Sequence, residues 1–255
     1  MVTKAPAREI TKAYAPDAQT MKTDGILILA LLVVMSVVAA AAVRGDEYDE
    51  ALTAASKRDY VAAAREFQGL ADQGDARGEN GLGVLYADGL GVRKDEKLAA
   101  QWFRKAAGKG YKAAQNNLGE LYFSGRGVQQ DYAAAQMWFR KAAAQGDSDA
   151  QKNLGLIYAG GLGVERDYAE AMDWFQRSAK QGNAAGQANI GHLFRTGDGV
   201  GRDYLMAYAW YGVAAAGGYP GGPQFRDSVA EYLTSSELKA GRDLARELFI
   251  KYGSK

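Results

Sequence analysis

The sequence predicts an all-α protein, built as a right-handed α-solenoid of helix-turn-helix repeats. Three observations support this fold: a period of 36 residues recurs four times without a gap, each period holds two helical stretches, and every tryptophan falls at one position of the period. Repeats of this length bury a continuous core only by stacking on their neighbours. Glycine is frequent, with 32 residues, and proline is rare, with 4, as expected for many helices joined by glycine turns.

The composition narrows the classes of function. Of the 255 residues, 47% are hydrophobic and 24% are charged, and the formal net charge is +1; these values are ordinary for a soluble globular protein. A nearly neutral chain offers no electrostatic reason to bind nucleic acid or an anionic membrane surface. The chain has no cysteine, which excludes disulfides, thiolate zinc sites and cysteine nucleophiles.

Residues 1–43 are predicted to direct export. Residues 26–43 carry no charge and end in a run of alanines, which is typical of a signal peptide cleaved after small residues such as Ala40 and Ala42. An uncleaved anchor is the alternative, because eighteen residues at about 1.5 Å each reach about 27 Å, enough to span a bilayer core. Met21 is an alternative start that would shorten the basic head. The basic residues in front of the apolar stretch are Lys4, Arg8, Lys12 and Lys22.

Both readings place the remainder of the chain outside the cytoplasm, because the basic end stays inside. We therefore expect a periplasmic or secreted protein, or alternatively a protein anchored in the inner membrane with its repeats facing the periplasm.

The four repeats cover residues 74–217. In each unit a leucine or isoleucine is followed by glycine, an aromatic residue, a Gly-x-Gly-Val turn, an aspartate and a tryptophan-aromatic pair. The units begin at Gly74, Gly110, Gly146 and Gly182, their aspartates are Asp95, Asp131, Asp167 and Asp203, and their tryptophans are Trp102, Trp138, Trp174 and Trp210.

Helical spacing predicts a buried stripe on both helices of each unit. At about 100° per residue, Leu118 and Tyr122 of the second unit face inward together, as do Trp138 and Phe139, and the tryptophans are expected in the core. The recurrent aspartate stands where an N-cap belongs, and the glycine at position ten of each unit lets a neighbouring helix approach. The basic pairs Arg104-Lys105 and Arg140-Lys141 are expected on a solvated outer face.

The unit pattern, G-D-x-x-A-Q-x-N-L-G-x-L-Y-x-x-G-x-G-V-x-x-D-Y-x-x-A-x-x-W-F-x-K-A-A, resembles the Sel1-like repeat, a relative of the tetratricopeptide repeat. The first unit departs from it, with Gly78, Glu79 and Gly81 where the pattern has Ala, Gln and Asn. Residues 44–73 echo the second half of a unit and are predicted as N-terminal capping helices. The resemblance implies that the first helices of the units line a concave groove.

Residues 218–255 are predicted as C-terminal capping helices. The segment from Gly217 to Pro223 interrupts the repeat, and Thr234 followed by Glu237 forms a capping box that opens a helix to about Tyr252. Its apolar side is expected to cover the second helix of the last repeat. The residues on that side are Leu238, Ala245, Leu248, Phe249 and Tyr252.

The sequence predicts no catalytic, metal or cofactor site. No strand precedes the Gly-x-Gly turns and no Lys-Ser/Thr follows them, so turn geometry explains them better than phosphate binding. The recurrent aspartates are explained as caps, and His192 has no serine or cysteine partner nearby in the sequence.

Positions 4, 7, 11 and 14 of each unit lie opposite the core stripe of the first helix and are left free by the repeat. Phe123 and Leu156 are expected to form a central apolar pair there, and an apolar anchor inside a polar rim is what a peptide or partner helix needs. The candidate groove residues are Asn80, Val84, Asn116, Glu120, Phe123, Lys152, Leu156, His192 and Arg195.

These features predict a non-enzymatic scaffold or adaptor of the bacterial cell envelope that binds another protein, an unidentified envelope protein or sensor, in its groove. An envelope enzyme or small-ligand binder acting on cell-wall material is the alternative. Nucleic acid is not an expected partner, and contact with the membrane is expected only through an uncleaved N-terminal segment.

Overall fold

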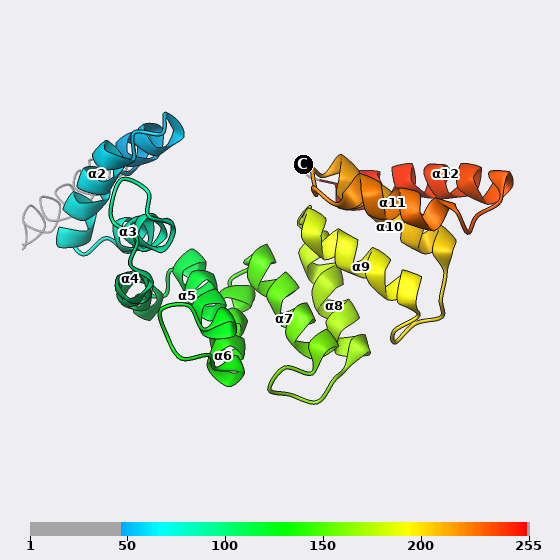
Figure 1. Ribbon diagram of the computed structural model, residues 1–255, viewed down its shortest axis with the longest axis horizontal. Coiled ribbons are helices and arrows are strands. Elements are labelled where there is room, and N and C mark those ends of the chain that lie inside the picture. The colour runs from blue at the N-terminus through cyan, green and yellow to red at the C-terminus, as the bar shows by residue number, and fades with distance from the viewer. Residues whose placement is uncertain (1–46, 254–255) are drawn as a thin grey trace, which may run out of the picture.

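The computed structural model describes residues 47–253, so the predictions about the export segment lie outside the described residues. The described part of the chain is all-α, as predicted, and its helices follow one another along an open arc (Figure 1). The helices are α2 (Tyr60–Asp72), α3 (Ala76–Asp88), α4 (Glu96–Gly108), α5 (Lys112–Ser124), α6 (Tyr132–Ala144), α7 (Ser148–Gly160), α8 (Tyr168–Ala179), α9 (Ala184–Thr196), α10 (Tyr204–Ala216), α11 (Gly222–Ala230) and α12 (Ser235–Tyr252), preceded by a helical stretch over residues 47–56.

Each predicted unit is an antiparallel helix pair: α3 with α4, α5 with α6, α7 with α8 and α9 with α10. The first helices line the inner side of the arc and the second helices its outer side (Figure 1). Consecutive pairs pack on one another, which confirms the α-solenoid. None of the helices between residues 47 and 253 combines the length and the apolar character that a bilayer crossing requires.

The recurrent aspartates are N-caps, as predicted. The Oδ1 atom of Asp131 accepts the amide of Ala134 at 2.9 Å, and Asp95 accepts the amide of Leu98 at the same distance. Such a bond satisfies one of the amides that the first turn of a helix leaves without a partner. The turn glycines are also explained by backbone geometry, because Gly125 ends α5 in the left-handed region with φ of 72°.

The glycine at position ten of each unit makes room for an aromatic ring of the second helix. A methyl group added to Gly119 would lie 2.6 Å from Cε1 of Phe139, closer than real Cβ atoms approach. Phe139 is fully buried in the core of its unit. The helix pair therefore packs at a spacing that only glycine permits at this position.

Three of the four tryptophans are only half-buried and pack against the edge of the core, so the prediction that all four are core residues holds fully for Trp210 alone. Only Trp210 is buried, with 4% exposure, whereas Trp138 is half-buried and has the Lys141 ammonium 4.3 Å from its ring centroid. The aromatic residue after each tryptophan is buried in all four units, because the position-ten glycine faces it. Helical periodicity assigns both aromatic residues to one face, but it does not predict how deeply each side chain is buried.

The basic pairs are exposed, as predicted, and their arginines also form hydrogen bonds between units. The guanidinium of Arg104 donates to the hydroxyl of Tyr122 at 3.2 Å, and Arg140 donates to Tyr158 at 2.6 Å. Each arginine thus links the second helix of one unit to the first helix of the next. These bonds add polar contacts to the apolar packing between units.

A buried glutamine at position six joins each middle unit to the one before it. Gln151 is buried; its Oε1 accepts from Gln181 at 2.8 Å and its amide donates to the carbonyl of Ala143 at 3.5 Å. Gln115 makes the equivalent bonds with Gln145 and with the carbonyl of Ala107. A buried amide costs free energy unless it is hydrogen-bonded, so this arrangement fixes how consecutive units stack.

The two terminal units replace this amide pair. In the first unit, Glu79 is 4% exposed and accepts from the ammonium of Lys109 at 2.7 Å, so both members of the pair have changed together. In the last unit, Gln187 donates instead to the carbonyl of Tyr252, at the end of α12, at 2.7 Å. The departure at Glu79 therefore has a structural reason.

The turn after Gly217 has the backbone geometry of the turns between units, although the segment from Gly217 to Pro223 departs from the repeat in sequence. Gly218 has φ of 84° and donates to the carbonyl of Ala215, as Gly182 with φ of 81° donates to Ala179 one unit earlier. The helix that follows, α11, occupies the place of the first helix of a fifth unit. Only α12 departs from the repeat.

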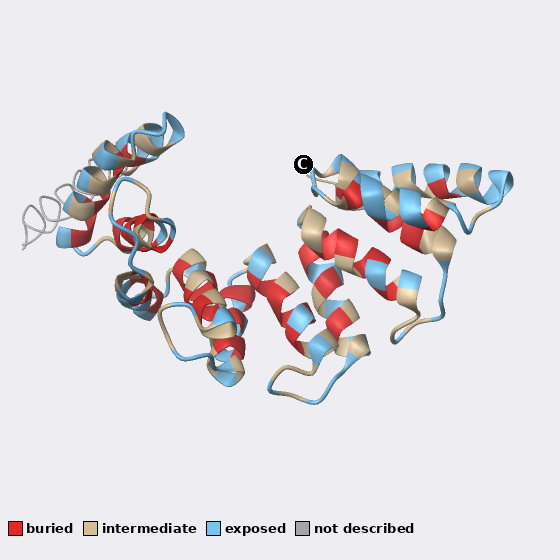
Figure 2. Ribbon diagram, in the orientation of Figure 1, coloured by how far each residue is buried: buried red, intermediate tan, exposed pale blue. Residues whose placement is uncertain are grey.

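Helix α12 covers α10, as predicted, and begins with the predicted capping box of Thr234 and Glu237. The ring of Trp210 lies 5.0 Å from that of Tyr252. Phe249, expected on the covered side, is 38% exposed and Ile250 is 85% exposed. Figure 2 shows the buried residues following the seams between helices, with exposed residues over the outer surfaces of α11 and α12.

Candidate partner-binding surface

The predicted groove residues lie on the first helices, along the inner side of the arc. Val84 on α3 and Leu156 on α7 are exposed, each at 36%, and His192 and Arg195 on α9 are exposed as well. Lys152 on α7 is half-buried. The inner face therefore presents apolar and charged side chains from three different units.

Asn116 is buried, at 7% exposure, because it belongs to a row of hydrogen bonds between units. The amide of Asn153 donates to Oδ1 of Asn116 at 3.0 Å and to Glu120 at 3.3 Å. The same bond joins Asn117 to Asn80 one unit earlier, also at 3.0 Å. These asparagines hold adjacent first helices together, which leaves Asn116 little surface for a partner.

Phe123 is explained by packing, contrary to the prediction. Its ring lies 5.5 Å from that of Tyr132 in an edge-on arrangement and 6.4 Å from that of Phe139. Phe123 packs against the hydrophobic core of units two and three, whereas Leu156 is solvent-exposed. Phe123 is half-buried against that core and Leu156 is exposed, so the two side chains of the expected central pair differ in burial.

A hollow of about 200 Å³ lies between the first helices of units one and two. It joins apolar side chains from α3, α4 and α5 to a rim of polar and charged ones, so it has the character expected of the groove. Its lining residues are Val84, Ala87, Asp88, Phe103, Asn117, Glu120, Leu121 and Arg126. Two of them, Val84 and Glu120, were predicted from the sequence.

A second hollow, of about 390 Å³, lies between the last repeat and α11. It occupies the equivalent place at the other end of the array, because Ser228 and Val229 stand at the repeat positions of Glu120 and Leu121. Its lining residues are Arg195, Thr196, Arg202, Tyr204, Ser228, Val229 and Tyr232. Of these only Arg195 was predicted from the sequence. Continuing the 36-residue count past Gly217 would have found Ser228 and Val229 of α11, and Tyr232, which follows that helix.

Arg195 connects this second hollow to the rest of the inner face. Its guanidinium lies 3.2 Å from Nδ1 of His192. Desolvation of the ring lowers the pKa of His192, and the positive charge of Arg195 lowers it further, against the opposing effect of Asp198. Burial raises the pKa of the Tyr211 hydroxyl, while a hydrogen bond from Arg195 acts in the opposite direction.

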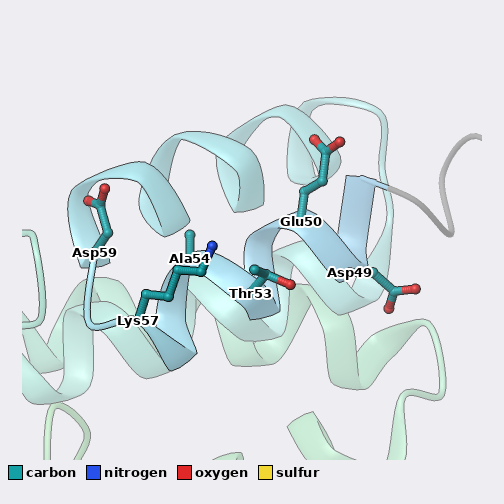
Figure 3. Close-up of a pocket in the computed structure, with 6 residues that line it drawn as sticks. All are labelled: Asp49, Glu50, Thr53, Ala54, Lys57 and Asp59. Atoms are coloured by element: carbon teal, nitrogen blue, oxygen red, sulfur yellow. The ribbon is translucent and has the colours of Figure 1, made fainter.

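A third hollow, of about 480 Å³, lies at the N-terminal end of the array (Figure 3). Asp59 accepts the amide of Ala62 there, as the N-cap of α2. The side chains drawn in Figure 3 point in different directions, away from a common centre. The residues that line it are Asp49, Glu50, Thr53, Ala54, Lys57 and Asp59. Within the described part of the chain, no three metal-ligating side chains gather in one place.

Comparison with known proteins agrees with this architecture. The family model described as the Sel1 repeat matches residues 76–111, 112–147, 148–183 and 184–219, together more than half of the chain. No curated protein matches the chain.

Solved structures show the same fold. A Sel1 repeat protein from Oxalobacter formigenes is 33% identical, with 78% of this chain and 84% of that chain covered and a TM-score of 0.67. A putative Sel1 repeat protein from Klebsiella pneumoniae subsp. pneumoniae is 26% identical over 73% of this chain and 93% of its own, with a TM-score of 0.54.

The immunity protein Pa5087 from Pseudomonas aeruginosa is 20% identical, with 80% of this chain and 81% of that chain covered and a TM-score of 0.55. This likeness concerns the fold alone. The match of all four units to the family model, and the identity with the Oxalobacter formigenes protein over most of both chains, show that the chain belongs to the Sel1 repeat family.

Proposed function

We propose that this chain is a non-enzymatic scaffold of the bacterial cell envelope, which binds a segment of a partner protein along its inner face. The observation that carries the proposal is the hollow between α3 and α5, where an apolar base is surrounded by polar and charged side chains. Small, well-packed apolar pockets inside a polar rim are where protein partners place their anchoring side chains.

The identity of the variable residues supports a binding role. Val84 and Leu156 are apolar, are exposed, and are not required by the repeat, since the same position holds Glu120 and His192 in the other two units. The ionisable residues that recur in every unit, such as Asp131, cap helices. A solenoid of stacked pairs also offers an extended concave surface, which suits a long segment of a partner.

Placement in the envelope rests on the sequence of residues 1–43 alone. A basic head, an apolar stretch and an exit of small residues are typical of exported proteins. N-terminal sequencing of protein from the periplasmic fraction tests this placement, and a start near Val43 is expected. Intact residues 1–40 in the membrane fraction would contradict cleavage and support the anchor.

The binding role is tested by placing a photocrosslinking amino acid at Val84 and at Leu156 on the inner face. The matched control is Met137 on α6, which is apolar, 45% exposed and on the outer side of the same array. We expect one discrete partner adduct from the two inner positions and none from Met137. Adducts from Met137 alone would move the binding surface to the outer face.

A further inference from the structure

The inner face carries opposite charge at its two ends. The hollow between α3 and α5 includes the carboxylates of Asp88 and Glu120, and its single basic residue, Arg126, lies 3.9 Å from Glu96. The hollow between the last repeat and α11 includes Arg195 and Arg202 and no carboxylate. The two hollows thus stand at equivalent places in the repeat. The first would attract a positively charged group, and the second a negatively charged one.

The two arginines of the second hollow have no carboxylate partner. Neither forms an ion pair with any acidic residue between 47 and 253. Asp203 is engaged as the N-cap of α10, and Asp227 is paired with Arg226 at 2.7 Å. Asp198, in the loop before Arg202, lies near His192, where its charge opposes the lowering of the His192 pKa.

The rest of the hollow suits a bound oxyanion. Tyr204 and Tyr232 form one wall, with their rings stacked 4.5 Å apart at an angle of 14°. Guanidinium groups bind carboxylates and phosphates through paired N–H donors, and tyrosine hydroxyls add further donors. Arg195 is held in place by His192, whose Nδ1 lies 3.2 Å from the guanidinium. One guanidinium is therefore fixed and the other, on Arg202, is free to close on a ligand.

We propose that this hollow binds a carboxylate of an acidic segment in the partner protein. This inference rests on the proposed scaffold function, and it adds a direction to the bound segment: acidic residues lie at the α9–α11 end, and basic residues lie beside Asp88 and Glu120 at the α3–α5 end. A carboxylate is favoured over free phosphate because the hollow continues a face built for an extended polypeptide, with Arg195 at a repeat position that lies on that face.

The test is an NMR titration of protein purified after export, following the arginine side-chain signals. The probes are acetylated and amidated tetraglutamate, tetralysine of the same form, and inorganic phosphate. We expect tetraglutamate to shift the Arg195 and Arg202 signals, and R202Q to weaken its binding by about tenfold. The matched control is R166Q, because Arg166 stands at the same position of the third unit, where Ala159 replaces the second arginine.

Equal tetraglutamate binding by the R202Q protein and the wild type would overturn the proposal, as would equal losses in R202Q and R166Q. Shifts caused by phosphate but not by tetraglutamate would show that the ligand is not a peptide carboxylate. Circular dichroism melts test whether unfolding causes the loss, which is not expected because the Arg202 side chain makes no hydrogen bond to any residue between 47 and 253. The titration needs no partner, so its failure leaves the scaffold proposal intact, and a failed crosslinking experiment leaves this site intact.

Discussion

Substitution of Gly119 by alanine tests whether the spacing of a helix pair depends on the absence of a side chain. Two effects of opposite sign compete at this position. Alanine is better than glycine in a helix interior by about 1 kcal/mol, which favours the variant. Against this, the added methyl group would lie 2.6, 2.7 and 3.2 Å from three carbon atoms of the Phe139 ring.

The packing effect is expected to win. Phe139 has no exposed surface, and its ring lies in a cluster with Leu154 and Ile157, so it has no free space to move into. Overpacking of a close-packed core costs about 1–3 kcal/mol, and the upper part of that range applies where the neighbour is fixed. We therefore expect Gly119→Ala to lower the free energy of unfolding by about 2 kcal/mol.

Urea unfolding followed by circular dichroism measures this loss, and Gly69→Ala is the matched control. Gly69 lies inside α2 and an added methyl group there meets no atom within 4 Å, so alanine is expected to stabilise by about 0.5–1 kcal/mol. The variant Phe139→Leu provides a second check: combined with Gly119→Ala, it should cost at least about 1 kcal/mol less than the two single changes added together.

Stabilisation by Gly119→Ala equal to that by Gly69→Ala would refute the reasoning. It would mean that the Phe139 ring yields without cost and that the glycine reflects something other than close packing. Additive losses in the double variant would lead to the same conclusion.

Three further outcomes are expected. Trp210→Ala should cost about 3–5 kcal/mol in urea unfolding and half-buried Trp138→Ala clearly less, and equal losses would contradict the difference in burial. Lys109→Ala should cost about 2–3 kcal/mol by leaving the buried Glu79 carboxylate unpaired, whereas Glu79→Gln with Lys109→Gln, which restores the amide pair of the middle units, should be nearly neutral. Because the folded-state pKa of His192 lies below its unfolded value of about 6.5, the unfolded chain takes up the proton first, so stability should fall as the pH drops below about 6.5. The free energy of unfolding of His192→Gln and of wild type is compared between about pH 7 and 5.5. The variant should lack the part of the pH dependence that comes from His192.

The sequence was sufficient to predict the solenoid because each unit repeats its own local signals. The caps at Asp95 and Asp131, the turn at Gly125 and the capping box at Thr234 depend on neighbours within a few residues. Such features are decided by backbone chemistry, which four aligned copies make easy to recognise.

The burial of individual side chains could not be predicted from such local signals. Helical spacing assigns a face, but Trp138 and Phe139 share a face and differ in burial because a glycine of another helix stands opposite one of them. Phe123 is similar, since its packing against Tyr132 depends on the turn between α5 and α6.

The hollow between α3 and α5 and the hollow at α11 were missed because each combines residues from consecutive units. Val84 and Glu120 were predicted one by one, but Asp88, Asn117 and Arg126 join them only when α3 and α5 stack. The hollow at α11 was further hidden by the glycines and prolines of residues 217–223, which look like the end of the repeat although the period continues.

Because the 36-residue period continues into α11, the length of this array can change by whole repeat units. The carbonyl of Tyr252 in α12 accepts the amide hydrogen bond of Gln187, so the fourth unit is covered by the helices that directly follow it. Duplication or loss of one 36-residue unit in the gene would move the acidic and basic ends of the inner face apart or together, and leave both ends chemically unchanged. The distance between two recognition points on a partner would then be set by a repeat number, a property that recombination alters far more readily than it builds a new surface.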